Sequence, residues 1–312
     1  MATRRTFLQQ TLASAATLSL MPMSNPLLAR PAAEPRISLA QWSLNRAIKN
    51  KTIQATDFAA IARRTYQIDA VEYVNGFYQA KKSKSSFWAE MLDRSQSEGV
   101  ANLLIMVDEE GDLGNPKAAK RKKAVENHYG WVDAAKALQC HSIRVNAFGT
   151  GEREVVKAAL VDGMGQLCAY GAEAGIHIVI ENHGLYSSEA DLMVEVIREV
   201  DSPYMGTLPD FGNWCTSEKW GATRDDSCEN VYNIVEGIQA FLPYAKGVSA
   251  KSYDFDAQGD QPRLDYRKLL QVVKDFGYEG YIGIEYEGEN LSEPDGIRAT
   301  KALIEKVWAT LD

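Results

Sequence analysis

Three acidic residues in the second half of the chain each follow a short apolar run. They are Glu181, Asp210 and Glu285, and such positions are typical of the ends of buried strands. An isolated buried carboxylate is costly, and three that converge would repel one another strongly without a cation. Hard oxygen ligands suit Mg²⁺ or Mn²⁺, so the pattern predicts a divalent metal site. The alternative is that each acid caps a helix or pairs with a nearby Arg or Lys.

The elements that would carry these acids alternate between short apolar runs and longer amphipathic stretches. The expected strands cover residues 37–42, 70–74, 101–107, 142–147, 177–181, 204–209, 246–250 and 281–286. The expected helices cover residues 52–66, 86–98, 115–138, 154–174, 192–200, 231–241, 266–276 and 296–311. This alternation predicts an α/β fold, a single-domain (β/α)₈ TIM barrel over residues 34–312. An open doubly wound sheet is the alternative, and it is disfavoured because no Gly-rich phosphate loop follows the first strand.

Three segments resemble a known barrel family, the xylose isomerase-like sugar (phosphate) isomerases and epimerases. They are Ile180-Glu181-Asn182-His183, Asp210 with Asn213 three residues later, and the run GYIGIEYE at 280–287. The resemblance covers nearly all of the chain after residue 33. It implies that Glu181, Asp210 and Glu285 hold a divalent metal, Mn²⁺ or Mg²⁺. It also implies that Glu181 and Glu285 form a proton-transfer pair on opposite faces of a small carbohydrate substrate.

The sequence departs from the family pattern at two positions. Where the family has a His ligand on the seventh strand, in a His-x-Lys context, this chain has Ser249 two residues before Lys251. A second family His, three residues after the sixth-strand Asp, is Asn213 here, a candidate for binding substrate. Serine is a poor ligand for a divalent cation. Either the metal keeps an extra water, or His183 or Lys251 compensates, or the site has lost its metal.

Further polar residues stand near the ends of the expected strands, where the active site of such a barrel lies. Glu72, Asn146 and His183 are candidates to bind sugar hydroxyls. Lys251 follows the seventh expected strand and could neutralise the acids. Arg144 precedes Asn146 by two residues, so both side chains would face the barrel interior or its mouth. Aromatic residues that could stack on a sugar are Trp42, Tyr73, Phe148, Trp214 and Tyr253.

The resemblance implies an enzyme that moves a proton at a carbon next to a carbonyl. Glu181 and Glu285 would remove and return the proton, while a metal or Lys251 stabilises the enediolate. We expect a sugar isomerase or epimerase. Loss of a β-substituent would instead make a lyase that acts on oxidised (keto) glycosides, and a non-catalytic sugar-binding barrel is a further alternative. A multi-zinc site like that of endonuclease IV is disfavoured, because the chain has only four His.

The first 33 residues have the pattern of an export signal. Thr3-Arg4-Arg5-Thr6-Phe7-Leu8 precedes a weakly apolar run that ends near Met23, which predicts a twin-arginine signal peptide over residues 1–33. We therefore expect a periplasmic or otherwise exported protein. The apolar run is shorter than the roughly 20 residues that span a bilayer, so no stable membrane anchor is expected.

The charge of the chain bears on its partners. The net charge is −8, and residues 1–33 contain three Arg and neither Lys nor acids, so the remainder carries −11. An acidic protein is a poor match for nucleic acid, whose phosphates require Lys and Arg.

Cys215 and Cys228 could pair in an oxidising periplasm, which the sequence does not decide. The sequence also leaves open whether the chain forms a homo-oligomer.

Overall fold

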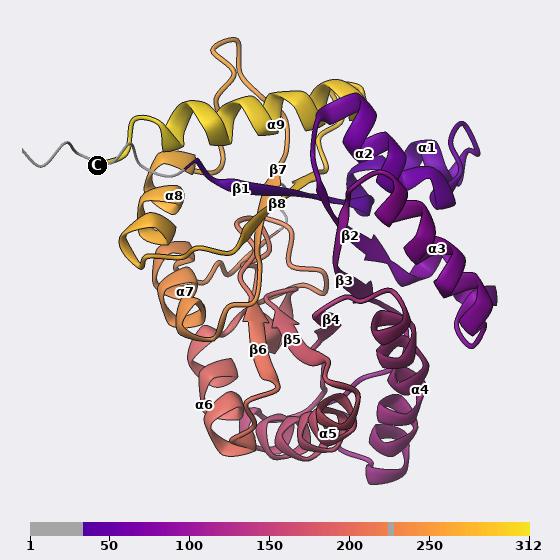
Figure 1. Ribbon diagram of the computed structural model, residues 1–312. Helices are drawn as coiled ribbons and strands as arrows, with labels where there is room; N and C mark the ends of the chain where they lie inside the picture. The colour runs from indigo at the N-terminus through magenta and orange to yellow at the C-terminus, as the bar shows by residue number, and fades with distance from the viewer. Residues whose placement is uncertain (1–33, 224–227) are drawn as a thin grey trace, which may run out of the picture. The chain divides into compact units, whose positions relative to one another are not determined.

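The strands of the protein lie at the centre of a surrounding set of helices (Figure 1). The structure is a computed structural model that describes residues 34–223 and 228–312. Within these residues eight strands are present: β1 (Arg36–Ala40), β2 (Ala70–Val74), β3 (Ala101–Val107), β4 (Ser142–Asn146), β5 (His177–Glu181), β6 (Met205–Leu208), β7 (Val248–Ser252) and β8 (Tyr281–Tyr286). The same residues form nine α-helices: α1 (Asn45–Lys49), α2 (Phe58–Tyr66), α3 (Ser85–Ser97), α4 (Ala118–Ala137), α5 (Arg153–Ala174), α6 (Ala190–Val200), α7 (Ile234–Phe241), α8 (Tyr266–Asp275) and α9 (Glu293–Trp308). The predicted single-domain (β/α)₈ barrel is confirmed, and the expected signal peptide lies outside the described residues.

The eight strands follow one another around a closed sheet. Their order is β6-β5-β4-β3-β2-β1-β8-β7, and each pair of neighbours is parallel. The ring is completed between β6 and β7 by isolated bridges that join Thr207 to Ala245 and Asp210 to Ser249. Because the strands are parallel, their carboxyl ends meet at one end of the barrel. The second bridge therefore places Asp210 beside Ser249 at that end.

Side chains alternate between two packing surfaces along each strand. The larger apolar cluster joins the helices to the sheet, and a smaller one contains Ala40, Val74, Leu104, Met106, Val179 and Leu208. This smaller cluster lies on the inward side of the strands. Glu181 and Asp210 stand two residues after Val179 and Leu208, so the same alternation turns both acids inward.

The helices of the outer ring form because their buried residues recur at helical spacing. In α6 these residues are Leu192, Met193, Val196 and Ile197. Each such side chain contributes about 1.5–3 kcal/mol when it is fully buried. Helix α7 begins later than expected from the sequence, because the side chain of Asn233 accepts hydrogen bonds from the first backbone amides of the helix.

The largest difference from the expected strands concerns β7. The sequence pattern predicts residues 246–250, whereas β7 covers Val248–Ser252. Lys246 stays in the preceding connection, where its backbone amide donates to the Thr207 carbonyl at 3.0 Å. Lys251 consequently lies inside the strand, in register with Glu285 of β8, and not after the strand as expected.

Cys215 and Cys228 form a disulfide, with their Cα atoms 5.8 Å apart. The sequence alone leaves this pairing open. The other two cysteines, Cys140 and Cys168, are free and buried.

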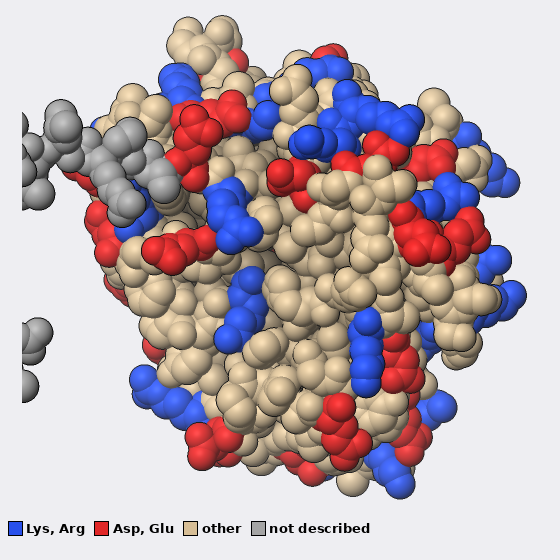
Figure 2. Space-filling model, in the orientation of Figure 1, with Lys and Arg blue, Asp and Glu red and all other residues tan. Residues whose placement is uncertain are grey.

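The surface carries charges of both signs, which alternate around the periphery of the face drawn in Figure 2. Several oppositely charged side chains pair directly. Arg153 Nη2, for example, lies 2.9 Å from Glu195 Oε1. Exposed pairs of this kind contribute about 0–1 kcal/mol each.

Within residues 34–223 and 228–312, no helix is both long and apolar enough to cross a bilayer.

Candidate active site

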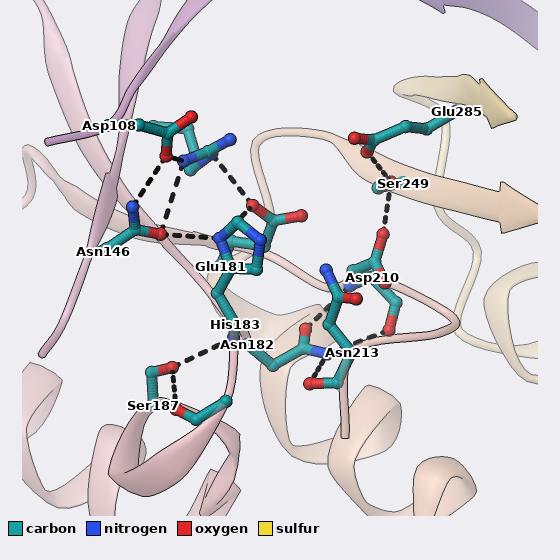
Figure 3. A network of polar contacts seen from close by, with 12 residues as sticks. Asp108, Asn146, Glu181, Asn182, His183, Ser187, Asp210, Asn213, Ser249 and Glu285 are labelled. Carbon is teal, nitrogen blue, oxygen red and sulfur yellow. Dashed lines mark hydrogen bonds and ion pairs between the residues drawn. The ribbon is translucent and has the colours of Figure 1, made fainter. Parts of the chain in front are cut away.

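Three carboxylates from different strands converge at the carboxyl end of the barrel (Figure 3). Glu181 ends β5, Asp210 follows β6 and Glu285 lies in β8. One oxygen from each residue lies within 4.8 Å of the corresponding oxygens of the other two. All three residues are at most 4 % exposed. The structure therefore brings together the residues that the sequence predicts as metal ligands.

Ser249 of β7 lies between two of these carboxylates. Its Oγ atom is 2.5 Å from Asp210 Oδ2 and 3.1 Å from Glu285 Oε2. A hydroxyl has one proton, so Ser249 donates to only one of the two acids at a time. Burial raises the pKa of Asp210 to about 7, against the opposing charge of Lys251. The position expected to carry a His ligand thus holds a small neutral group that links two acids.

Lys251 of β7 brings a positive charge to the same cluster. Its Nζ atom lies 2.9 Å from Glu287 Oε1 and 3.5 Å from Glu285 Oε1, and the side chain is 2 % exposed. Burial by itself would lower the pKa of Lys251, but the surrounding carboxylates raise it well above its ordinary value. Lys251 is therefore a buried ammonium ion at neutral pH.

Arg144 of β4 supplies a second buried cation and contacts two acids. Its Nε atom lies 2.9 Å from Glu181 Oε2, and its Nη1 atom lies 2.5 Å from Asp108 Oδ1. Burial opposes ionisation of Asp108, but the charge of Arg144 and the hydrogen bonds from Arg144 and Asn146 outweigh it and lower the pKa of Asp108 to about 2. For Glu181 burial dominates over Arg144 and raises the pKa well above its ordinary value. The two acids on one guanidinium therefore differ in their proton affinity.

His183 is oriented by a chain of hydrogen bonds that begins at Asp108. The amide nitrogen of Asn146 donates to Asp108 Oδ1 at 2.7 Å. The amide oxygen of Asn146 therefore accepts from Nδ1 of His183, at 2.7 Å. Burial, together with Arg144, lowers the pKa of His183 well below its ordinary value, so the ring is neutral. With the proton on Nδ1, the Nε2 atom of His183 is an acceptor.

A cavity of about 560 Å³ adjoins the cluster. Small-molecule sites occupy roughly 300–1,000 Å³, so the cavity suits a sugar-sized ligand. Its polar lining includes Arg144, His183, Asn213, Lys251 and Glu285, and its apolar lining includes Trp42, Val74, Met106 and Trp220. The amide nitrogen of Asn213 is buried and finds no hydrogen-bond partner among the described residues. Asn213 therefore offers an unused donor at the cavity.

Asn182 fixes the loop that follows β6. Its side-chain nitrogen donates to the carbonyls of Asp210 and Asn213, at 3.1 and 3.2 Å. Its side-chain oxygen accepts from the backbone amide of Asp210 at 2.8 Å. The sequence indicates no role for Asn182, but the structure shows that it holds β5 and the Asp210 segment together.

The geometry agrees with a comparison of the chain with known protein families. The family described as Xylose isomerase-like TIM barrel matches residues 60–307. The chain belongs to this family. The resemblance noted in the sequence is thereby confirmed at the level of the family.

Curated relatives match the chain over short segments. The chain is 35 % identical over 60 residues to the 3'-dehydrocarminate deglycosidase alpha subunit of Microbacterium sp, which covers 19 % of this chain and 17 % of the relative. It is also 35 % identical over 63 residues to the C-glycoside deglycosidase alpha subunit of Arthrobacter globiformis, covering 19 % and 18 %. The chain thus matches less than a fifth of the length of each relative.

Solved structures share the xylose isomerase-like fold over nearly their whole length. For the 3-keto-D-glucoside 4-epimerase from E. coli the TM-score is 0.65 at 12 % identity, covering 88 % of this chain and 100 % of that one. For a xylose isomerase-like TIM barrel protein from Mycobacterium smegmatis in complex with magnesium, the TM-score is 0.62 at 17 % identity, covering 89 % and 97 %. At these identities the likeness establishes the fold.

The structure brings most of the residues predicted for the site close together: Glu181, Asp210, Glu285, Lys251, His183, Asn146 and Asn213. Of these, Glu285, Lys251, His183 and Asn213 line the cavity. Sequence reasoning assigns no role to Asp108, Glu287 or Trp220, which also line the cavity. Asp108 directly follows β3. Like Glu181, it is an acid at the end of an apolar run, so the same pattern would also have identified it.

Three of the aromatic residues considered for stacking lie elsewhere. Tyr73 and Trp214 are fully buried in the core, and Tyr253 is 3 % exposed. The hydroxyl of Tyr253 donates to the carbonyl of Gly212, so the Tyr253 ring packs inside the protein. Trp42 does line the cavity, and the ring of Phe148 lies 6.4 Å from that of His183.

Glu72 lies deeper in the barrel than a residue at the carboxyl end of a strand would. It is the third of five residues in β2, and its Oε1 atom accepts from the hydroxyl of Ser38 at 2.6 Å. A Cβ added at Gly283 would lie 2.6 Å from the same oxygen, so the glycine of β8 makes room for this side chain. Glu72 is not among the residues that line the cavity. Burial raises the pKa of Glu72 to about 7.

Glu72 is expected to make the protein less stable as pH rises from about 4.5 to 7. In this window the folded chain keeps a proton on Glu72 that the unfolded chain has released, so raising the pH lowers the free energy of unfolding. Glu72→Gln should flatten this dependence and stabilise the protein at pH 8 by about 1–3 kcal/mol. Urea unfolding between pH 4.5 and 8 measures both effects. An unchanged pH dependence would show that Glu72 is ionised in the folded protein throughout.

Proposed function

We propose that the protein is a sugar isomerase or epimerase that moves a proton at a carbon next to a carbonyl. The observation that carries the proposal is the pair of buried carboxylates, Glu181 and Glu285, whose oxygens lie within 4.8 Å of each other and of which Glu285 lines the cavity. One carboxylate removes the proton and the other returns it. Because burial raises the pKa of Glu181, this residue suits the group that returns the proton. Glu285 then removes it.

Three neighbouring groups are suited to bind the oxygens of a keto-sugar. The ammonium of Lys251, 3.5 Å from Glu285 Oε1, stabilises negative charge that develops on the enediolate oxygen. The Nδ1-protonated His183 presents an acceptor for a sugar hydroxyl. Asn213 presents the amide donor that is unused within the described part of the chain. Together these groups orient the carbon that loses its proton between the two glutamates.

The donor set of the cluster fits a divalent cation. Glu181, Asp210 and Glu285 would hold Mn²⁺ or Mg²⁺ through carboxylate oxygens, which both cations prefer. Acids also outnumber basic side chains in the carboxylate cluster and its ion pairs, which favours a cation. The acids are Glu181, Asp210, Glu285, Asp108 and Glu287, and the basic side chains are Arg144 and Lys251. When bound, the cation would polarise the substrate carbonyl and stabilise the enediolate.

Adding Mn²⁺ to metal-free protein is expected to raise the midpoint of thermal unfolding. A ligand that binds only the folded state stabilises it by about 2.7 kcal/mol at a concentration of 100 times its Kd. Asp210→Asn should reduce the shift, because it removes one charged ligand, whereas Glu173→Gln on the exposed face of α5 should keep it. Differential scanning calorimetry with and without EDTA measures these midpoints. Identical midpoints with and without Mn²⁺ would argue against the metal site.

A second candidate function is a lyase that acts on keto-glycosides. The names of the two curated relatives favour it, as does the apolar lining of the cavity, where Trp42, Met106 and Trp220 would face an aglycone. The first step would be the same: a glutamate removes the proton next to the carbonyl. The bond from the β-carbon to the aglycone oxygen or carbon then breaks, the aglycone leaves with the electron pair, and an enone remains. The leaving aglycone takes a proton from the other glutamate.

Proton exchange in D₂O tests the proposed function and separates the candidates. Protein supplied with Mn²⁺ is incubated with D-fructose, methyl 3-keto-β-D-glucopyranoside or phenyl 3-keto-β-D-glucopyranoside, and NMR follows each sugar. Deuterium at the carbon next to the carbonyl, with an epimer or isomer as product, supports the isomerase or epimerase. Release of phenol supports the lyase. Binding without exchange for any of the sugars would indicate a non-catalytic sugar-binding barrel.

We also propose that the protein is exported by the twin-arginine route. The Arg4-Arg5 motif supports this, and a disulfide between Cys215 and Cys228 suits an oxidising compartment. Fractionation of cells that express the full chain, with Arg4→Lys/Arg5→Lys as the comparison, tests it. Equal cytoplasmic retention of both forms would argue against export.

A further inference from the structure

Trp220 forms a wall of the candidate active site. It lines the cavity of about 560 Å³ and also separates it from a neighbouring hollow of about 180 Å³. Its ring centroid lies 5.0 Å from that of His183 and 5.6 Å from that of Phe148, in edge-to-face arrangements. The residue is nevertheless 37 % exposed. Lys219 Nζ also lies 4.9 Å from the centroid of this ring. A partly exposed aromatic ring that lines the cavity beside polar groups suits stacking against the apolar face of a sugar.

The backbone at Trp220 adopts a conformation that a bulky residue avoids. Its φ is +71°, in the left-handed region, which costs about 1–3 kcal/mol and persists only where the surroundings enforce it. The surroundings here include Gly184, which directly follows His183. A Cβ at Gly184 would lie 2.2 Å from the Glu218 carbonyl oxygen and 2.7 Å from the Trp220 amide nitrogen. The loop that carries Trp220 is therefore pressed directly against the end of β5.

A disulfide closes the base of this loop. Cys215, five residues before Trp220, is bonded to Cys228. The backbone amide of Cys215 donates to the carbonyl of Gly221 at 3.0 Å, and that of Thr216 donates to the carbonyl of Asn230 at 2.8 Å. The disulfide thus ties the first residue of the loop to Cys228, and the hydrogen bond between Cys215 and Gly221 closes the loop one residue after Trp220.

We propose that Trp220 is a substrate-binding residue and that the Cys215–Cys228 disulfide positions it. The proposal rests on the proposed function, since it names a wall of the same sugar site. With the disulfide intact, the constrained loop offsets the cost of the left-handed backbone and holds the indole beside His183. Without it, the loop relaxes to a less costly conformation and the indole leaves the wall. Because Trp220 acts on binding and not on proton transfer, its loss changes KM and leaves kcat largely unchanged.

A double-mutant cycle tests both parts of the proposal on the full protein. The variants are Trp220→Ala, Cys215→Ala/Cys228→Ala and their combination, and the probe is methyl 3-keto-β-D-glucopyranoside, followed by calorimetric titration. We expect Trp220→Ala to raise Kd about tenfold, which corresponds to about 1.4 kcal/mol. Removal of the disulfide should raise Kd by a similar factor. The combined variant should bind no worse than Trp220→Ala, because both changes remove the same contact.

Matched controls distinguish this role from a loss of folding. Trp220→Phe keeps an aromatic face and should bind within about threefold of the wild-type protein. Cys140→Ala/Cys168→Ala removes the two buried free thiols and should leave Kd unchanged. If Trp220→Ala does not fold, as judged by circular dichroism, Trp220→Leu takes its place with the same expectation.

The possible outcomes separate this proposal from the proposed function. An unchanged Kd in Trp220→Ala would overturn the proposal. So would a Kd raised about a hundredfold in the combined variant, because the two changes would then act independently. The wild-type protein could bind the probe in a Trp220-dependent manner and yet exchange no proton. The binding role of Trp220 would then be supported, and the proposed isomerase or epimerase activity would be wrong. If the wild-type protein binds neither this probe nor D-fructose nor the phenyl 3-keto-glucoside, both are wrong.

Discussion

Replacing either Glu181 or Glu285 with glutamine is expected to lower deuterium exchange into a keto-sugar by about 10²- to 10⁴-fold. Glutamine nearly preserves the shape of glutamate, but its amide neither accepts nor releases the transferred proton. Both carboxylates are buried, so water and buffer bases do not readily take their place. NMR in D₂O measures the rate, and circular dichroism of the same samples shows whether the fold is retained.

A third substitution separates proton transfer from metal binding. Asp210→Asn removes a predicted metal ligand but neither member of the proton-transfer pair. Excess Mn²⁺ is therefore expected to restore much of its activity, and to restore little in Glu181→Gln or Glu285→Gln. Glu173→Gln makes the same chemical change on the exposed face of α5 and should exchange protons at the wild-type rate. Full exchange in both glutamate variants would rule out the proposed pair.

The sequence predicts the position of the three carboxylates because two simple regularities coincide. Apolar residues of limited run length mark the strands, and parallel strands end on one side of a barrel. Glu181 and Asp210 then follow inward-facing apolar residues at a spacing of two, which fixes their direction. Local patterns therefore suffice for the barrel and for the acids at its carboxyl end. The same patterns place β7 two residues too early, because the apolar run that ends at Ala250 does not indicate that the strand continues through Lys251 and Ser252.

The contacts between these residues depend on long-range packing that no local pattern encodes. Ser249 lies between Asp210 and Glu285 because β6 and β7 meet where the barrel closes, 39 residues apart in the chain. Glu72 is followed by two more strand residues, and the register of β2 against β3 shifts between Val71 and Glu72. Its depth in the barrel follows from that register. A sequence without the structure gives the residue types at these positions but not their partners.

Trp220 illustrates a second kind of limit. It lies in a loop without periodicity, and its left-handed backbone is enforced by contacts with Gly184, which is 36 residues away. The unpaired amide of Asn213 is similar, since only the three-dimensional arrangement of the described residues reveals that it is unused. Residues that contact ligands from loops are therefore the part of the site that sequence reasoning recovers least.

Replacing Lys251 with methionine is expected to destabilise the protein by about 3–5 kcal/mol at neutral pH, as breaking a buried ion pair typically does. Methionine fills most of the volume of lysine, so the loss is chiefly electrostatic. Glu285 and Glu287 lie 3.5 and 2.9 Å from the ammonium and would lose the charge that compensates them. Urea unfolding measures the change. Lys268→Met, on an exposed position of α8, is the matched control and should stay within about 0.5 kcal/mol of the wild-type protein.

Two further measurements show whether the charge itself is responsible. Lys251→Met/Glu287→Gln removes both partners, so it should be more stable than Lys251→Met alone by about 0.5–3 kcal/mol. Mn²⁺ should also stabilise Lys251→Met more than it stabilises the wild-type protein, because the cation would replace the missing positive charge beside the carboxylates. If neither change recovers stability, Lys251 supports the barrel through packing of its aliphatic stem. The proposed role of its ammonium group beside the enediolate would then lose its electrostatic basis.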